Sequence, residues 1–210
     1  MKKRKISFKK IIRFVLILII IAAIGFGCFW YFNNEDTTPI KKKVKVEDEI
    51  KEYGYKMDDN ETKYYKGLFK ELKSTLESDK VDYDKYAKLL SQLFIADFMN
   101  LDNKTSKNDI GGVQFVYTDF QSDFTKLARD GIYSSVAIDK SDKQEMPEVT
   151  KVEVTNLEHI AHKYLDKTDE DAISIELKIT YKTDLDYQST TNLILVHNDK
   201  KLEIVKMTEK

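Results

Sequence analysis

Asp97 is the side chain whose position in the sequence points most directly to chemistry. It lies in DYDKYAKLLSQLFIADFMNL, residues 82–101, four residues after Leu93 and four before Leu101, on the apolar stripe of an expected helix. A carboxylate there is desolvated, which raises its pKa and suits it to act as a general base or to hold a ligand. The alternative is a structural acid that lies at the edge of the stripe or accepts hydrogen bonds from a backbone group, a lysine or a tyrosine. The structural role is favoured, because ion-pair networks also place acids in such positions.

The other candidates for chemistry are His159 and His162 in the segment EHIAH. On a helix this spacing would place both rings on one face, but VTKVEVTNLEHIAHKY predicts a strand, where odd spacing sends them to opposite faces. A closed metal site would also need His197 or a carboxylate as a further ligand. The sequence contains no G-x-S-x-G and no phosphate loop, and its only S-x-x-K, starting at Ser7, lies in the basic N-terminal segment. We therefore expect no enzyme, no metal and no cofactor.

Four tyrosines near the expected helix starts offer a different function. They could form an exposed aromatic patch for a partner, because tyrosine is enriched at protein interfaces. Core packing is the alternative, and the periodicity favours it. The residues are Tyr64, Tyr65, Tyr83 and Tyr86.

The elements that must position these residues change period along the chain. Apolar residues at helical spacing predict helices within 58–78 and 82–101, and a third from a Thr118/Gln121 capping box to a stop at Gly131. From Ile173 every second residue is apolar, which predicts an antiparallel strand that could run on to Tyr187. Segments 149–164, 190–197 and 201–207 predict three more strands. Three helices followed by about four strands indicate an α+β fold, with the helices packed on one face of a curved antiparallel sheet.

This order of elements resembles the cone-shaped fold of nuclear transport factor 2-like domains. Joined to the N-terminal segments described next, it is similar in architecture to the single-pass scaffold proteins of type IV secretion and Gram-positive conjugation systems. The resemblance covers the whole chain and rests on topology, so no functional residue is carried over. It implies a role in the assembly of an envelope complex.

Residues 14–32, FVLILIIIAAIGFGCFWYF, predict a transmembrane helix. The run begins at Phe14, contains no charge or proline, and is long enough to cross a bilayer. It ends on Trp30, Tyr31 and Phe32, aromatic residues of the kind found at membrane interfaces. A cleaved signal would have a shorter apolar region and a better cleavage site. Cys28, the only cysteine, raises lipid attachment as another alternative, but Gly27 alone fits such a motif.

The charge distribution predicts the orientation of this helix. Seven lysines and arginines and no acidic residue lie in residues 1–13, which predicts a cytoplasmic N-terminus and a C-terminal part outside the cytoplasm. The remainder of the chain then carries a net charge of about −8, which excludes a typical nucleic-acid-binding protein.

Together these features predict four regions: a cytoplasmic basic head at 1–13, a signal anchor at 14–32, a charged stalk at 33–57 and an extracytoplasmic α+β domain at 58–210. The expected function is that of a non-enzymatic, membrane-anchored interaction or scaffold protein with envelope partners, and the resemblance suggests conjugation or secretion as the process. The alternative is a small-ligand-binding or weakly catalytic cone domain with a pocket around Asp97. The sequence leaves the oligomeric state open.

Overall fold

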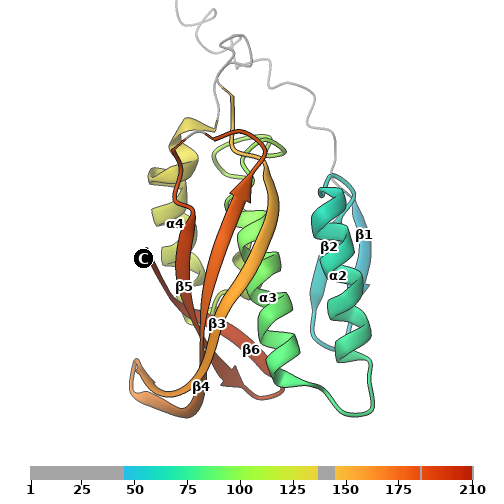
Figure 1. The fold of residues 1–210 in the computed structure, drawn as a ribbon, viewed down its shortest axis with the longest axis vertical. Coiled ribbons are helices and arrows are strands. Elements are labelled where there is room, and N and C mark those ends of the chain that lie inside the picture. Colours follow the sequence, from blue (N-terminus) through green and yellow to red (C-terminus); the bar gives the residue numbers. More distant parts are fainter. Residues whose placement is uncertain (1–44, 137–144, 185, 210) are drawn as a thin grey trace, which may run out of the picture. The chain divides into compact units, whose positions relative to one another are not determined.

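The computed structural model describes residues 45–136, 145–184 and 186–209 and confirms an α+β fold (Figure 1). Its main sheet is an antiparallel meander in the order β3-β4-β5-β6, accompanied by three α-helices and a separate two-stranded sheet, β1-β2. The helices are α2 (Lys63–Leu76), α3 (Tyr83–Phe98) and α4 (Gln121–Asp130). The strands are β1 (Val46–Ile50), β2 (Tyr55–Asp58), β3 (Val149–Tyr164), β4 (Lys167–Tyr181), β5 (Thr190–Asn198) and β6 (Lys201–Glu209).

The apolar segment 14–32, including Phe14, Trp30, Tyr31 and Phe32, lies outside the described residues, so the transmembrane helix stays a prediction. Within the described part of the chain, no helix is both long and apolar enough to cross a bilayer.

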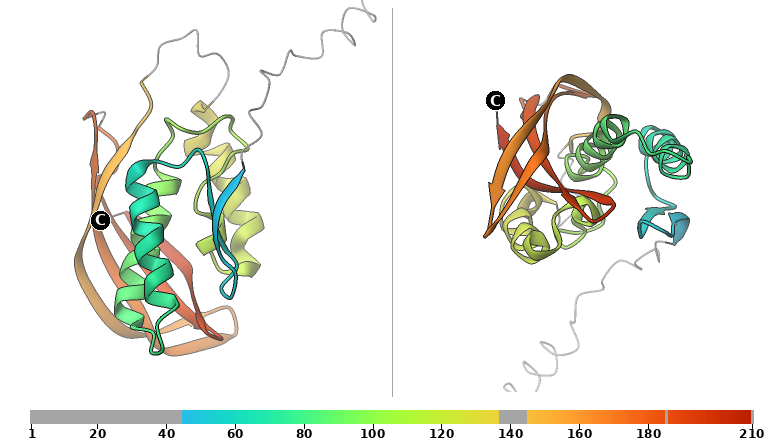
Figure 2. Two further views of the ribbon diagram at one scale, coloured as in Figure 1. Left: turned by 90° about the vertical axis from the view of Figure 1, so that its right-hand side faces the viewer. Right: turned by 90° about the horizontal axis from the view of Figure 1, so that it is seen from below.

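Helix α3 lies at the centre of the domain, between α2 and the main sheet (Figure 2). Asp82 caps its N-terminus by accepting a hydrogen bond from the backbone N–H of Lys85, and Thr62 caps α2 in the same way. The apolar stripe expected on α2 is buried, and α3 is buried over most of its circumference, as its broad stripe predicts. Burial on two sides explains why α3 carries Asp97 far from water.

Helix α4 begins differently from the prediction. Thr118 lies in a short 3₁₀ turn, Thr118–Phe120, and the side chain of Gln121 donates to the backbone carbonyl of Val116, 3.0 Å away. The predicted capping box is therefore wrong. The backbone N–H of Tyr117 bonds to the carbonyl of Ile204 in β6, and this contact outside the helix fixes the approach to α4. Gly131 follows the last helical residue, as expected.

The main sheet buries one face in the main core and part of its other face in a smaller cluster. Ile173, Ile175, Leu177 and Ile179 alternate along β4 and are buried in the main core, as predicted. Next to them β5 buries four consecutive residues, Leu193–Val196, because its second face packs against Ala172 and Tyr117 in a smaller cluster. Strand β4 ends at Tyr181, so the extension to Tyr187 is wrong.

Residues 46–57 belong to the folded domain and not to the predicted stalk. They lie within the β1–β2 hairpin, whose turn contains Gly54 at a φ of 69°. The hairpin contributes four buried side chains to the core: Ile50, Tyr53, Tyr55 and Met57. The charges that suggested a solvated stalk pair instead with α2, where Lys66 contacts Glu47 and Lys73 contacts Asp48. The compact unit thus begins before the predicted boundary at 58 and includes all of β1, which starts at Val46.

Candidate functional site

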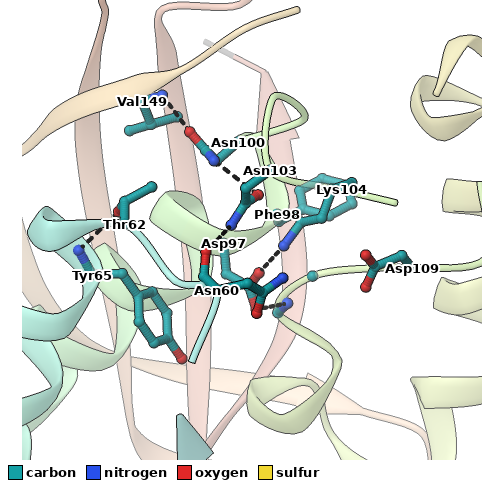
Figure 3. A network of polar contacts seen from close by, with 12 residues as sticks. Asn60, Thr62, Tyr65, Asp97, Phe98, Asn100, Asn103, Lys104, Asp109 and Val149 are labelled. Carbon is teal, nitrogen blue, oxygen red and sulfur yellow. Dashed lines mark hydrogen bonds and ion pairs between the residues drawn. The ribbon is translucent and has the colours of Figure 1, made fainter. Parts of the chain in front are cut away.

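Asp97 forms the centre of a buried polar network at the end of α3 (Figure 3). Asp97 is 8% exposed, and both of its carboxylate oxygens have partners within the domain. Oδ1 contacts the ammonium group of Lys104, and Oδ2 accepts a hydrogen bond from the backbone N–H of Gly112 at 2.6 Å. Asp97 therefore fits the alternative of a structural acid, because one carboxylate oxygen is ion-paired and the other is hydrogen-bonded within the domain.

The loop after α3 delivers both partners to Asp97, and three amide contacts hold its beginning in place. The side chain of Asn100 donates to Asn103 at 2.9 Å and accepts from the backbone N–H of Val149 at 2.8 Å, which joins the loop to the start of β3. Asn103 in turn donates to the backbone carbonyl of Asn60 at 3.5 Å. The segment before α2 and the segment around Lys104 therefore lie side by side (Figure 3).

Glycine is needed where the loop returns to α3. Gly112 has a φ of 75°, and a Cβ added there would come within 2.7 Å of the Phe94 ring. The preceding Gly111 donates its N–H to the Tyr133 hydroxyl at 3.0 Å, and that hydroxyl donates to the carbonyl of Phe98 at 2.8 Å. The Gly-Gly pair allows backbone N–H groups to approach the end of α3 closely.

Lys104 is a buried cation, 7% exposed as a residue. Burial by itself lowers the pKa of a lysine, but the negative charges of Asp97 and Glu61 outweigh it and raise the pKa of Lys104 above its usual range. The ammonium form is therefore the stable one beside the Asp97 carboxylate.

Two side chains beside this network, those of Glu61 and Asn60, have an incomplete set of contacts. Oε2 of Glu61 is buried and has no hydrogen-bond partner among the described residues, and the same is true of Oδ1 of the neighbouring Asn60. Burial, aided by the charge of Asp97, raises the pKa of Glu61 to about 7. Burial also raises the pKa of Asp58, although less strongly. Near neutral pH, Glu61 is thus present in both its protonated and its ionised forms.

The four tyrosines do not form the exposed aromatic patch that the sequence left open as a possibility. Tyr65 and Tyr86 are buried in the core, and the hydroxyl of Tyr86 lies 2.5 Å from that of Tyr55. Tyr64 and Tyr83 are half-buried. Tyr64 donates to the carbonyl of Val152 at 3.2 Å and accepts from its N–H at 2.8 Å, so its hydroxyl caps the edge of β3. All four side chains pack in the core or against it, which is the alternative that the periodicity favoured.

All three histidines lie on strands, as expected for EHIAH, and His159 and His197 contact carboxylates. His159 is exposed and bridges Asp171 and Asp84, with nitrogen–oxygen distances of 2.7 and 2.9 Å. Its hydrogen bonds to Asp171 and then to Asp84 raise its pKa above the usual value. His197 contacts Asp169 at 3.0 Å. No group of three or more His, Cys, Asp or Glu side chains in the described ranges has a geometry that could hold a metal ion.

One cavity of about 340 Å³ lies between the β1–β2 hairpin and the C-terminal end of α2. Its lining consists of Ile50, Tyr53 and Leu76 together with charged side chains, and none of the lining residues belongs to the Asp97 network. The pocket that the alternative function requires at Asp97 therefore does not coincide with this cavity.

Sequence reasoning found Asp97 but missed Lys104, Glu61 and Gly112. Asp97 interrupts a helical stripe, which is a signal, whereas Lys104 and Glu61 come from segments without periodicity. The chemistry available to the network is proton exchange and reaction between an amine and a carboxyl group. No family model, curated protein or solved structure matches the chain.

Proposed function

We propose that this chain is a membrane-anchored interaction protein whose α+β domain lies outside the cytoplasm and binds other envelope proteins as part of a scaffold. The observation that carries the proposal is the uncharged apolar run at 14–32 that directly follows a basic head. A protein held at the membrane in this way works where the other components of an envelope assembly are found. Conjugation and secretion channels are the assemblies that the resemblance to nuclear transport factor 2-like scaffold domains suggests.

Binding is favoured over catalysis by the contacts of the ionisable groups. Asp97, the best candidate for a base or a ligand contact, has Lys104 on one oxygen and the N–H of Gly112 on the other. A substrate or ligand would have to displace both. These contacts give the ligand-binding alternative no support, and the proposal assigns no enzymatic activity.

Cross-linking in the native membrane tests this function. The full chain is cross-linked in cells, purified under denaturing conditions, and its partners are identified by mass spectrometry. The control lacks residues 45–210 but keeps the head and the apolar segment. We expect a reproducible set of envelope proteins that disappears with the control. Recovery of the chain alone, or of the same proteins with the control, would refute an interaction through the α+β domain.

A further inference from the structure

We propose that the side chains of Lys104 and Asp97 become joined by an intramolecular amide bond, with Glu61 carrying the protons of the reaction. This modification goes beyond the proposed function and does not depend on it. Four observations support it: the contact between the two groups, their burial, the backbone donor on Asp97 and the incomplete contacts of Glu61.

The reacting groups are already together. Nζ of Lys104 lies against Oδ1 of Asp97, and the side chains are only 4% and 11% exposed. The rigid helix α3 supplies the carboxylate, and the Asn100 and Asn103 contacts hold the loop that supplies the amine. Such fixed neighbours react with effective concentrations on the order of 10⁵ M or more, which removes much of the entropic barrier to condensation. Burial also excludes the water that would oppose amide formation.

Asp97 is held in an orientation that suits attack on its carboxyl carbon. Oδ2 accepts the N–H of Gly112 at 2.6 Å, while Oδ1 faces the lysine. When the amine adds to the carboxyl carbon, negative charge develops on the oxygen that is retained. If that oxygen is Oδ2, the Gly112 N–H stabilises the charge, as a backbone donor does in an oxyanion hole. Oδ1 is then the oxygen that leaves.

Glu61 supplies the proton transfers. The hydrogen bond from Asn103 to the carbonyl of Asn60 joins the segments that carry Glu61 and Lys104, and Oε2 of Glu61 is buried with no hydrogen-bond partner in the described part of the chain. A pKa of about 7 lets this carboxyl group both accept and donate a proton near neutral pH. The ionised form takes a proton from the ammonium group, and the protonated form gives it to the leaving oxygen.

The reaction balances without an external reagent. It starts from an ammonium and a carboxylate. The lysine nitrogen forms a bond to the carboxyl carbon of Asp97 and loses two protons. Both protons pass through Glu61 to Oδ1, the carbon–oxygen bond breaks, and one water leaves. Glu61 returns to its starting state. Because the ion pair holds the pKa of Lys104 high, the neutral amine is scarce, and we expect the bond to form slowly after folding.

Mass spectrometry of the full chain tests the proposal. The protein is purified in detergent, shown to be folded by circular dichroism, incubated at neutral pH and then denatured for measurement of its intact mass. We expect the mass to be lower than that of the sequence by one water, and proteolysis to yield a branched peptide that links Lys104 to Asp97. A folded wild-type chain that keeps its full mass would overturn the proposal, independently of any variant.

Three variants identify the bond. Lys104→Arg keeps the positive charge but removes the amine, so we expect the full mass. Glu61→Gln keeps the shape of the proton carrier without its function, and it should also retain the full mass. Asp97→Asn should lose ammonia in place of water. Loss of water that persists in Lys104→Arg would overturn the assignment, since it would indicate ring closure of Asp97 onto its own backbone. Loss that persists in Glu61→Gln would overturn the role of Glu61.

Discussion

The raised pKa of Glu61 predicts a pH dependence of stability that a single substitution removes. Because burial raises the pKa from 4.5 to about 7, the folded domain keeps a proton that the unfolded chain loses as the pH rises through this range. The Glu61 contribution therefore destabilises the fold increasingly between about pH 4.5 and pH 7 and is constant above. At about 1.4 kcal/mol per pH unit, the full contribution is about 3 kcal/mol. Between about pH 5 and pH 8 it changes by roughly 2 to 3 kcal/mol.

Urea unfolding of the freshly purified full chain in a mild detergent, before the amide bond has formed, measures this contribution. Glu61→Gln keeps the size and polarity of the side chain but cannot ionise. We expect the wild type to lose roughly 2 to 3 kcal/mol relative to this variant between about pH 5 and pH 8. The comparison is between pH values, so effects of the substitution that do not depend on pH cancel. Parallel stability profiles for the two proteins would show that Glu61 titrates normally and would refute the argument from burial.

Three further predictions concern other parts of the domain. Gly112→Ala should destabilise the domain by roughly 2 kcal/mol or more in the same unfolding assay, because the residue has a positive φ and its new Cβ would clash with the Phe94 ring of α3. The control Gly67→Ala, in open space within α2, should stabilise the domain by about 0.5–1 kcal/mol. Equal effects of the two substitutions would contradict this account. Tyr64→Phe should cost about 1–3 kcal/mol in that assay, because the N–H of Val152 at the β3 edge loses its partner while the carbonyl keeps its hydrogen bond from Gln92, and a neutral result would mean that water replaces the hydroxyl. In an NMR titration the pKa of His159 should lie above 6.5 and fall in Asp171→Asn, and an unchanged value in the variant would contradict the assigned cause.

The periodic parts of the fold were predictable from the sequence. Helices α2 and α3 and strands β3–β6 each bury one face or nearly all of their surface, so their apolar residues repeat at the spacing of the element. The β1–β2 hairpin was not predicted, since its buried residues are separated by charges that pair with α2 only once the domain is folded. The start of α4 was missed for a similar reason, because it depends on a backbone bond between Tyr117 and Ile204.

The candidate site was predictable in part. Asp97 could be recognised because an acid on an apolar stripe needs a partner. The identity of that partner could not, because Lys104 comes from an irregular loop whose course is set by the contacts of Asn100 and Asn103. Glu61 precedes a helix, where acidic residues are common, and only the approach of the loop buries it.

The location of the α+β domain is the central claim, and labelling of single cysteines tests it most directly. Cys28 is replaced by serine, and a cysteine is placed at Lys126, on the exposed side of α4, or at Lys3 in the basic head. A maleimide that cannot cross membranes is then added to cells whose outer layers have been removed. We expect Lys126→Cys to be labelled on intact membranes and Lys3→Cys only after lysis. Labelling of Lys126→Cys only after lysis would place the domain in the cytoplasm and contradict the account.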